Sequence, residues 1–193
     1  MIEILSLYNK IHSDEKKQFE SSVKTFKKKK GDFLLFDGDV QDSLFMIKKG
    51  VTFLYDDTGR DRRILDFFYN NRFCADFISF TNQSASKYCI ECLSNCIIES
   101  ISYDSLQKAF NQSKAIETAY RVLLEKMLIA SILQNVNQRE LSMEDRFKQI
   151  MHRKPELFKM IPHKYIASYV NIDVTNFSKL YNKHCVRNGL LYK

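Results

Sequence analysis

The sequence contains no long run of apolar residues. No stretch approaches the roughly 18 consecutive apolar residues that a membrane-spanning helix needs. The first residues also lack the basic segment, apolar core and small-residue cleavage site of a secretion signal. These absences argue against a membrane or secreted protein, and we expect the 193-residue chain to be a globular cytoplasmic protein without a membrane partner.

Cysteine, proline and glycine are all scarce, with five, two and five residues. Five cysteines are an odd number, too few for a secreted disulfide scaffold, so we expect free thiols. The spacing of Cys89, Cys92 and Cys96 resembles that of a metal site. On a strand, however, residues 89 and 92 point to opposite faces, which favours small buried side chains over metal or redox sensing.

Catalytic motifs are also missing. The four histidines have no ligand or triad spacing, no glycine-rich loop could hold a phosphate, and no serine or cysteine lies in a nucleophile motif. The sequence therefore predicts that the protein is not an enzyme and has no catalytic residues.

The positive charge is unevenly distributed. Residues 1–138 carry 19 Lys and Arg against 18 Asp and Glu, whereas residues 139–193 carry 11 against 5, so +6 of the net +7 lies in the last part of the chain. Such a distribution is expected where a segment meets a polyanion. A merely solvated basic face is the alternative.

The N-terminal part is predicted to be a small antiparallel β-structure behind short helices. Helical spacing covers residues 1–22, and residues 26–102 contain short β-rich runs separated by turn signals. The runs are 33–36, 43–47, 51–55, 64–68 and 89–102, and four of the five glycines, Gly31, Gly38, Gly50 and Gly59, lie in turns. We expect about six to eight strands closing a barrel or jelly roll.

One long helix is expected over residues 113–139. Apolar and polar residues recur there by four and three, the spacing of coiled-coil a and d positions. The predicted dimer-interface residues are Ile116, Tyr120, Leu123, Met127 and Ala130. A monomeric helix buried on both faces is the alternative to this homodimer.

The last segment, 140–193, has the pattern of a helix-turn-helix. A helix starts near Ser142, and two further helices are expected around the turn Asn171-Ile172-Asp173, with Asp173 as N-cap of the second. The predicted DNA-binding residues on that second helix are Val174, Thr175, Ser178, Lys179 and Asn182. Any two amphipathic helices joined by a turn can mimic this motif, but the local charge favours DNA.

Two segments together resemble the cyclic-AMP receptor protein/fumarate-nitrate regulator (Crp/Fnr) family of bacterial transcription regulators. They are KKKKGDFLLFDGDVQDSLFMIKKGVTFLYDDTGRDRRILDFF and SMEDRFKQIMHRKPELFKMIPHKYIASYVNIDVTNFSKL. The resemblance implies an α+β fold with an N-terminal antiparallel β-roll, like a cyclic-nucleotide-binding jelly roll, over 1–112. A long dimerisation helix over 113–139 and a DNA-binding domain over 140–193 follow. Double-stranded DNA, a second copy of the chain and RNA polymerase are the implied partners.

The implied ligand pocket departs from the family pattern. The Gly-Glu pair of cyclic-nucleotide binders corresponds to Ala75-Asp76, and their Arg-Ser/Thr pair to Ser86-Lys87. Loss of the arginine removes the planar bidentate phosphate donor, and Lys87 does not replace it. We expect no cyclic AMP bound in the usual way and no cofactor, although another small effector stays open. Ser131 is the remaining pocket candidate, with a small residue of a helix interface as its alternative role.

The implied DNA contacts depart as well. Thr175 and Lys179 stand where many members have the Glu and Arg that read base pairs, which implies altered specificity. The sequence also ends at Lys193, where longer members continue into a β wing. The alternative function is therefore a ligand-binding sensor that acts through protein partners without specific DNA binding.

Overall fold

A computed structural model describes residues 1–57 and 62–187, with the backbone alone for 137–138 and 185–187. Two short helices open the chain, α1 (Ile2–Leu5) and α2 (Ser13–Ser21), as the helical spacing predicted. The strands are β1 (Lys24–Lys28), β2 (Phe33–Leu35), β3 (Ser43–Lys49), β4 (Val51–Asp57), β5 (Arg62–Tyr69), β6 (Arg72–Cys74), β7 (Cys89–Cys92) and β8 (Cys96–Ser102). Helix α3 (Phe77–Asn82) lies between β6 and β7.

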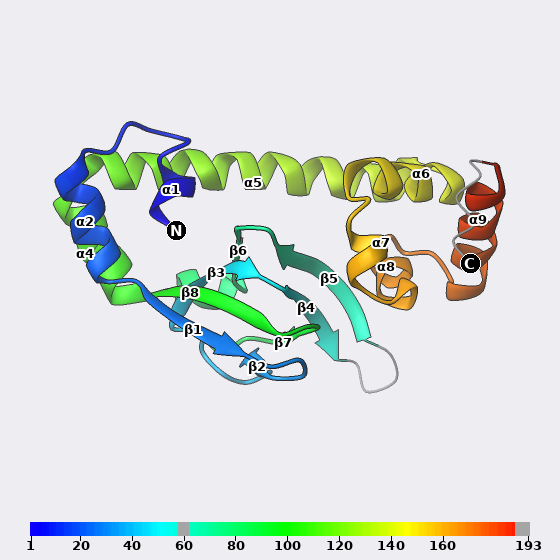
Figure 1. The fold of residues 1–193 in the computed structure, drawn as a ribbon, viewed down its shortest axis with the longest axis horizontal. Helices are drawn as coiled ribbons and strands as arrows, with labels where there is room; N and C mark the ends of the chain where they lie inside the picture. Colours follow the sequence, from blue (N-terminus) through cyan, green and yellow to red (C-terminus); the bar gives the residue numbers. More distant parts are fainter. Residues whose placement is uncertain (58–61, 188–193) are drawn as a thin grey trace.

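The strands form two four-stranded sheets, with the orders β1-β8-β3-β6 and β2-β7-β4-β5. Every pairing within them is antiparallel. Side chains alternate across each sheet: Phe45 and Ile47 of β3 belong to the core inside the roll, whereas Leu44 and Met46 face the N-terminal helices. The predicted jelly roll is confirmed, and its two sheets lie below the long helix α5 in Figure 1.

Glycine is required at the β3–β4 turn. Gly50 has φ +90°, and a Cβ there would lie 2.5 Å from the carbonyl oxygen of Asn95 and 2.7 Å from Sγ of Cys96. Gly31 and Gly38 also have positive φ, as expected of turn glycines. Gly59 lies outside the described residues.

The expected strand 89–102 is in fact two strands. The chain leaves β7 in one sheet and enters β8 in the other, and Ser94 at the crossing accepts a hydrogen bond from the Val51 amide at 3.0 Å. Cys89 and Cys92 lie in different cores, on opposite faces of β7 as predicted. The four described cysteines, Cys74, Cys89, Cys92 and Cys96, are buried free thiols.

Three elements of the roll have weak sequence signals. Strand β1 is lysine-rich and mostly exposed, so its apolar alternation is poor. Strand β6 has only three residues. The only local signal for helix α3 is its N-cap residue, Asp76. The Asp76 carboxylate accepts a hydrogen bond from the Ile78 amide at 3.0 Å.

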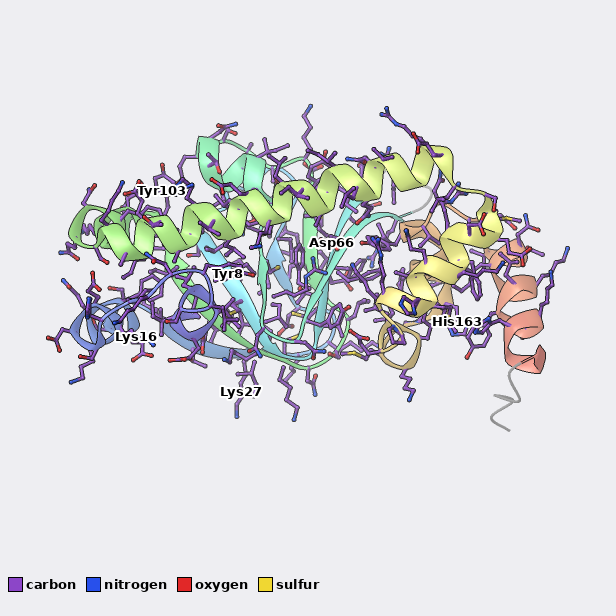
Figure 2. The ribbon with its side chains drawn as sticks, turned by 90° about the horizontal axis from the view of Figure 1, so that it is seen from above. Tyr8, Lys16, Lys27, Asp66, Tyr103 and His163 are labelled. Atoms are coloured by element: carbon purple, nitrogen blue, oxygen red, sulfur yellow. The ribbon has the colours of Figure 1, made fainter. Side chains whose placement is uncertain are left out.

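Two helices carry the chain out of the roll and along it. Helix α4 (Tyr103–Gln112) is followed by α5 (Lys114–Glu140), whose 27 residues make a rod of about 40 Å. Figure 2, seen from above, shows Tyr8 beside α5, and Tyr8 packs with the first half of that helix in a shared core. None of the described helices, in 1–57 and 62–187, is both long and apolar enough to cross a bilayer.

The C-terminal helices return to the roll. They are α6 (Met143–Arg153), α7 (Leu157–Met160), α8 (His163–Tyr169) and α9 (Val174–Arg187). Helix α8 lies on β5, where Ser168 Oγ accepts from the Ile64 amide at 3.0 Å and donates to the Arg62 carbonyl at 3.2 Å. One hydrophobic core therefore runs from the outer face of β4 and β5 into the C-terminal helices.

Candidate functional site

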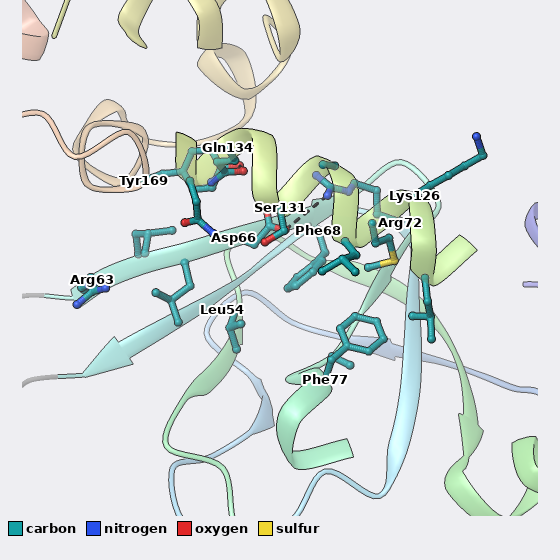
Figure 3. A pocket seen from close by; sticks show the side chains of 18 of the residues that line it. Leu54, Arg63, Asp66, Phe68, Arg72, Phe77, Lys126, Ser131, Gln134 and Tyr169 are labelled. Carbon is teal, nitrogen blue, oxygen red and sulfur yellow. Dashed lines mark hydrogen bonds and ion pairs between the residues drawn. The ribbon is translucent and has the colours of Figure 1, made fainter. Parts of the chain in front are cut away.

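A large open cleft of about 1250 Å³ lies between the roll, α5 and α8. Its walls include Leu54 and Phe68 from the roll, Ser131 and Gln134 from α5, and Tyr169 from α8 (Figure 3). The volume exceeds the roughly 300–1,000 Å³ of ordinary small-molecule pockets. The cleft can therefore take a ligand that touches both the roll and the C-terminal helices.

A charged network lies along this cleft. Asp66 of β5 lies 3.5 Å from the Arg72 guanidinium and 3.7 Å from Lys154 Nζ. Lys154 donates to the Tyr169 hydroxyl at 2.8 Å, and that hydroxyl donates to Gln134 at 2.8 Å. Burial lowers the pKa of Lys154, and Asp66 acts in the opposite direction. These five residues come from β5, β6, α5, the end of α6 and α8, so no local pattern in the sequence could have identified them together.

Only two of the five predicted pocket residues line the cleft. They are Ala75 and Ser131. Asp76 and Ser86 are 4% and 3% exposed and bond to each other, with Ser86 Oγ 2.8 Å from the Asp76 carboxylate. Lys87 is exposed.

The Asp76–Ser86 pair is already satisfied within the chain. The second carboxylate oxygen of Asp76 caps α3, and Ser86 Oγ also accepts from the Tyr88 amide at 2.9 Å. A carboxylate in this place repels a phosphate, and none of the arginines whose side chains the structure describes bonds to the pair. The geometry therefore does not favour a cyclic phosphate here.

Replacing Asp76 by Ala is expected to lower the free energy of unfolding by about 1–3 kcal/mol, because a helix cap and a buried hydrogen bond are lost together. Urea unfolding measures this loss. Asp76→Asn is the matched control, since it keeps an acceptor and should lose less. Equal stability of the wild type and Asp76→Ala would contradict the structural role of the pair.

The predicted dimer-interface residues are used mainly inside the chain. Ile116 and Leu123 are 2% and 6% exposed, and Tyr120 and Met127 pack against the same core. Burial raises the pKa of Tyr120 to about 12. Only Ala130 is exposed. We do not retain the other four as partner contacts, because α1 and the roll cover that face of α5.

A second apolar face of α5 is uncovered. Its side chains are 40–61% exposed and follow one another at helical spacing along the second half of the helix: Leu128, Ile129, Ile132, Leu133 and Val136. At 3.6 residues per turn this stripe lies about half a turn away from the buried Ile116–Leu123 face. We call it the α5 stripe.

Helices α8 and α9 lie where the sequence predicted the two helices of a helix-turn-helix. Asp173 caps α9 by accepting from the amides of Thr175 and Asn176 at 2.9 and 3.1 Å. The turn is made possible by Asn171, with φ +52°. Ala167 is fully buried, and its small side chain allows the two helices to approach closely.

The two sides of α9 differ sharply. Phe177 is fully buried, with its ring centroid 5.3 Å from that of Phe147. The five predicted DNA-binding residues are all exposed on the other side: Val174, Thr175, Ser178, Lys179 and Asn182. The structure thus brings them together on one accessible face.

Comparisons with known proteins agree with this architecture. Residues 25–113 match the family model of the cyclic nucleotide-binding domain. A search of curated protein sequences finds no match.

Several solved structures share the fold over most of the chain. The c-di-GMP responsive global regulator CLP of Xanthomonas campestris has a TM-score of 0.70 and 18% identity, covering 94% of this chain and 95% of its own. FixK2 from Bradyrhizobium japonicum has a TM-score of 0.72 and 11% identity, covering 89% and 88%. A Eubacterium rectale protein described as a regulator of the Crp/Fnr family has a TM-score of 0.67 and 16% identity, covering 94% and 87%. Residues 25–113 are therefore similar to the cyclic nucleotide-binding domain, and most of the chain shares its fold with these solved structures.

Proposed function

We propose that this protein is a dimeric transcription regulator that binds double-stranded DNA through α9. The observation that carries the proposal is the exposed face of α9, which presents hydroxyl, amide and ammonium groups while its opposite face is buried. These groups suit base edges and phosphates. The surrounding segment 139–193 holds +6 of the chain's net charge of +7.

The dimer is proposed to form through the α5 stripe. Five neighbouring apolar side chains that stay exposed in one chain are costly in water and would be buried against the same stripe of a second copy. In a two-fold dimer, the two copies of α9 would lie about 34 Å apart and would enter successive major grooves of the DNA. The operator is then expected to be near-palindromic.

The sensor part is proposed to respond to something other than cyclic AMP held in the usual way. Residues 25–113 match the cyclic nucleotide-binding domain. The Asp76–Ser86 pair, however, occupies the place where the sequence comparison puts the phosphate of a bound cyclic nucleotide. The regulator from Xanthomonas campestris is described as responsive to c-di-GMP. A regulator of similar fold is therefore described as responding to a ligand other than cyclic AMP.

The test is selection of bound genomic DNA fragments by the purified protein at physiological salt, with and without cyclic AMP. We expect the same near-palindromic site in both conditions. Enrichment only with cyclic AMP would overturn the role given to Asp76 and Ser86. No enrichment in either condition would favour a sensor that acts through protein partners.

Replacing Lys179 by Ala is expected to weaken binding to the selected site by about 1–3 kcal/mol, roughly 5- to 150-fold, because its ammonium group is proposed to contact a base edge. Fluorescence anisotropy of a labelled duplex measures the change. Lys108→Ala removes the same charge from the exposed side of α4 and should leave the affinity nearly unchanged. An unchanged affinity of the Lys179 variant would remove this residue from the interface.

A further inference from the structure

A second cavity opens where α5, α6, α8 and β6 meet. It measures about 170 Å³, and a cavity needs only about 10–15 Å³ to hold one water, so it has room for a group of phosphate size. Its polar walls are Arg72, Gln134, Arg146, Gln149, Arg153, Lys154 and Tyr169. We call this cavity the junction pocket.

The junction pocket is strongly positive. Four of its lining residues are cationic and none is acidic. Asp66 lies just outside and is shared between Arg72 and Lys154 at 3.5 and 3.7 Å. Glu156 also acts on Lys154. The side chains that line the pocket itself are nevertheless cationic, and such a lining suits an anion.

Burial leaves the charge of Lys154 poorly solvated, and a nearby anion would stabilise that charge. The Lys154 side chain is only 20% exposed, and desolvation lowers its pKa more than Asp66 raises it. Arg153, by contrast, is exposed at the rim of the pocket, so its guanidinium can turn toward a ligand. Arg146 is held in place by bonds to the carbonyls of Leu141 and Asn171 at 3.1 and 3.0 Å. The pocket thus combines fixed positive charge with one adjustable donor.

The junction pocket continues into the large cleft. Arg72, Ala130, Gln134 and Tyr169 line both cavities. Figure 3 labels Arg72, Gln134 and Tyr169 in the wall of the cleft, which also includes the apolar side chains of Leu54 and Phe68. A ligand with an anionic head and an apolar or aromatic body would fill both cavities at once.

We propose that the junction pocket binds the phosphate group of a small phosphorylated metabolite whose body lies in the cleft. Arginine guanidinium groups bind phosphate oxygens in a planar, bidentate geometry, and four cationic side chains suit the double negative charge of a phosphate better than the single charge of a carboxylate. The site is separate from the phosphate position of the roll, because neither Asp76 nor Ser86 lines it. The proposal goes beyond DNA binding and does not depend on it.

Such a ligand would connect three parts of the molecule. Arg72 belongs to β6, Gln134 to α5 and Arg153 to α6. A phosphate bound to all three residues would hold the C-terminal helices against the roll, because it would lose some of these contacts if the helices moved away from the roll. Occupancy of the junction pocket is therefore expected to raise the melting temperature of the whole chain.

The test is isothermal titration of the full chain with adenosine 5′-monophosphate and, as a charge-only probe, inorganic pyrophosphate. We expect saturable binding of both, with one site per chain. Arg153→Gln should weaken the binding of both about tenfold, the effect of losing one charged hydrogen bond. Arg72→Gln combined with Arg153→Gln should abolish measurable binding.

Arg121→Gln is the matched control. It removes the same charge from an exposed position of α5 where Arg121 pairs with Glu125, and it should bind both probes as the wild type does. Circular dichroism shows whether each variant is folded. Because Arg153 is exposed, its single variant keeps the test decisive even if the double variant unfolds.

Three results would overturn the proposal. They are the absence of saturable binding by the wild type, an equal loss in Arg121→Gln, and adenosine monophosphate binding that is as tight in Arg153→Gln as in the wild type. Binding of pyrophosphate alone would overturn the placement of the ligand body in the cleft.

A random-sequence duplex forms the last arm of the experiment. A metabolite site predicts unchanged duplex affinity in Arg153→Gln. Loss of duplex affinity in this variant, without nucleotide binding by the wild type, would assign these cations to the DNA backbone and overturn the proposal.

Discussion

Replacing Ile132 by Glu is expected to convert a dimeric protein into a monomer. Ile132 is 53% exposed at the middle of the α5 stripe, so the single chain should fold normally with either residue. In the proposed dimer the new carboxylate would be buried against an apolar partner, and such a penalty amounts to several kcal/mol per ion. The dimer dissociation constant should therefore rise at least about 100-fold.

Sedimentation equilibrium measures this change, with circular dichroism as the check on folding. Leu7→Glu is the matched control, because Leu7 is 75% exposed but lies outside α5. The control should stay dimeric. A wild-type protein that is monomeric at micromolar concentration, or an Ile132 variant that dimerises as well as the wild type, would refute the α5 stripe as the interface.

The same variant separates dimerisation from DNA contact. Its α9 is unchanged, so weak non-specific binding should persist, since that depends on charge. Binding to a palindromic site should fall steeply, because only a dimer contacts both half-sites at once. Full retention of site affinity by a monomer would contradict the two-fold arrangement.

Replacing Phe177 by Ala is expected to cost about 3–5 kcal/mol of stability, a large part of the roughly 5–15 kcal/mol of an ordinary domain. Phe177 is fully buried, and its ring lies against Phe147, Phe158 and His163, with centroids 5.3, 5.9 and 5.9 Å away. Truncation would leave a cavity between α6, α7 and α9. The C-terminal helices should loosen, and DNA binding should be lost with them.

Urea unfolding and limited proteolysis measure this effect. Phe36→Ala is the control, because Phe36 is 52% exposed and stacks only on the neighbouring Phe33. It should cost less than about 1 kcal/mol. A similar loss in both variants would mean that the aromatic cluster around Phe177 does not hold the C-terminal helices together.

The sequence was sufficient wherever one short segment carries its own physical reason. The positive φ of Gly50, the caps by Ser142 and Asp173, and the split between buried and exposed sides of α9 all follow from residues a few positions apart. The alternation of residues with a period of two likewise predicted most strands of the roll. Such signals act through local backbone sterics and hydrogen bonds, which do not need the rest of the fold.

The tertiary structure was needed wherever two surfaces compete or distant segments meet. Helix α5 is apolar on two opposite faces, and only the packing of α1 and the roll shows that Ile116 and Leu123 are covered while Ile132 is not. The pairing of Asp76 with Ser86 across ten residues, and of Asp66 with Arg72 and Lys154, depends on how strands and helices are placed. Periodicity shows that a face is apolar, but burial depends on which other element reaches it, and that is decided by contacts remote in the sequence.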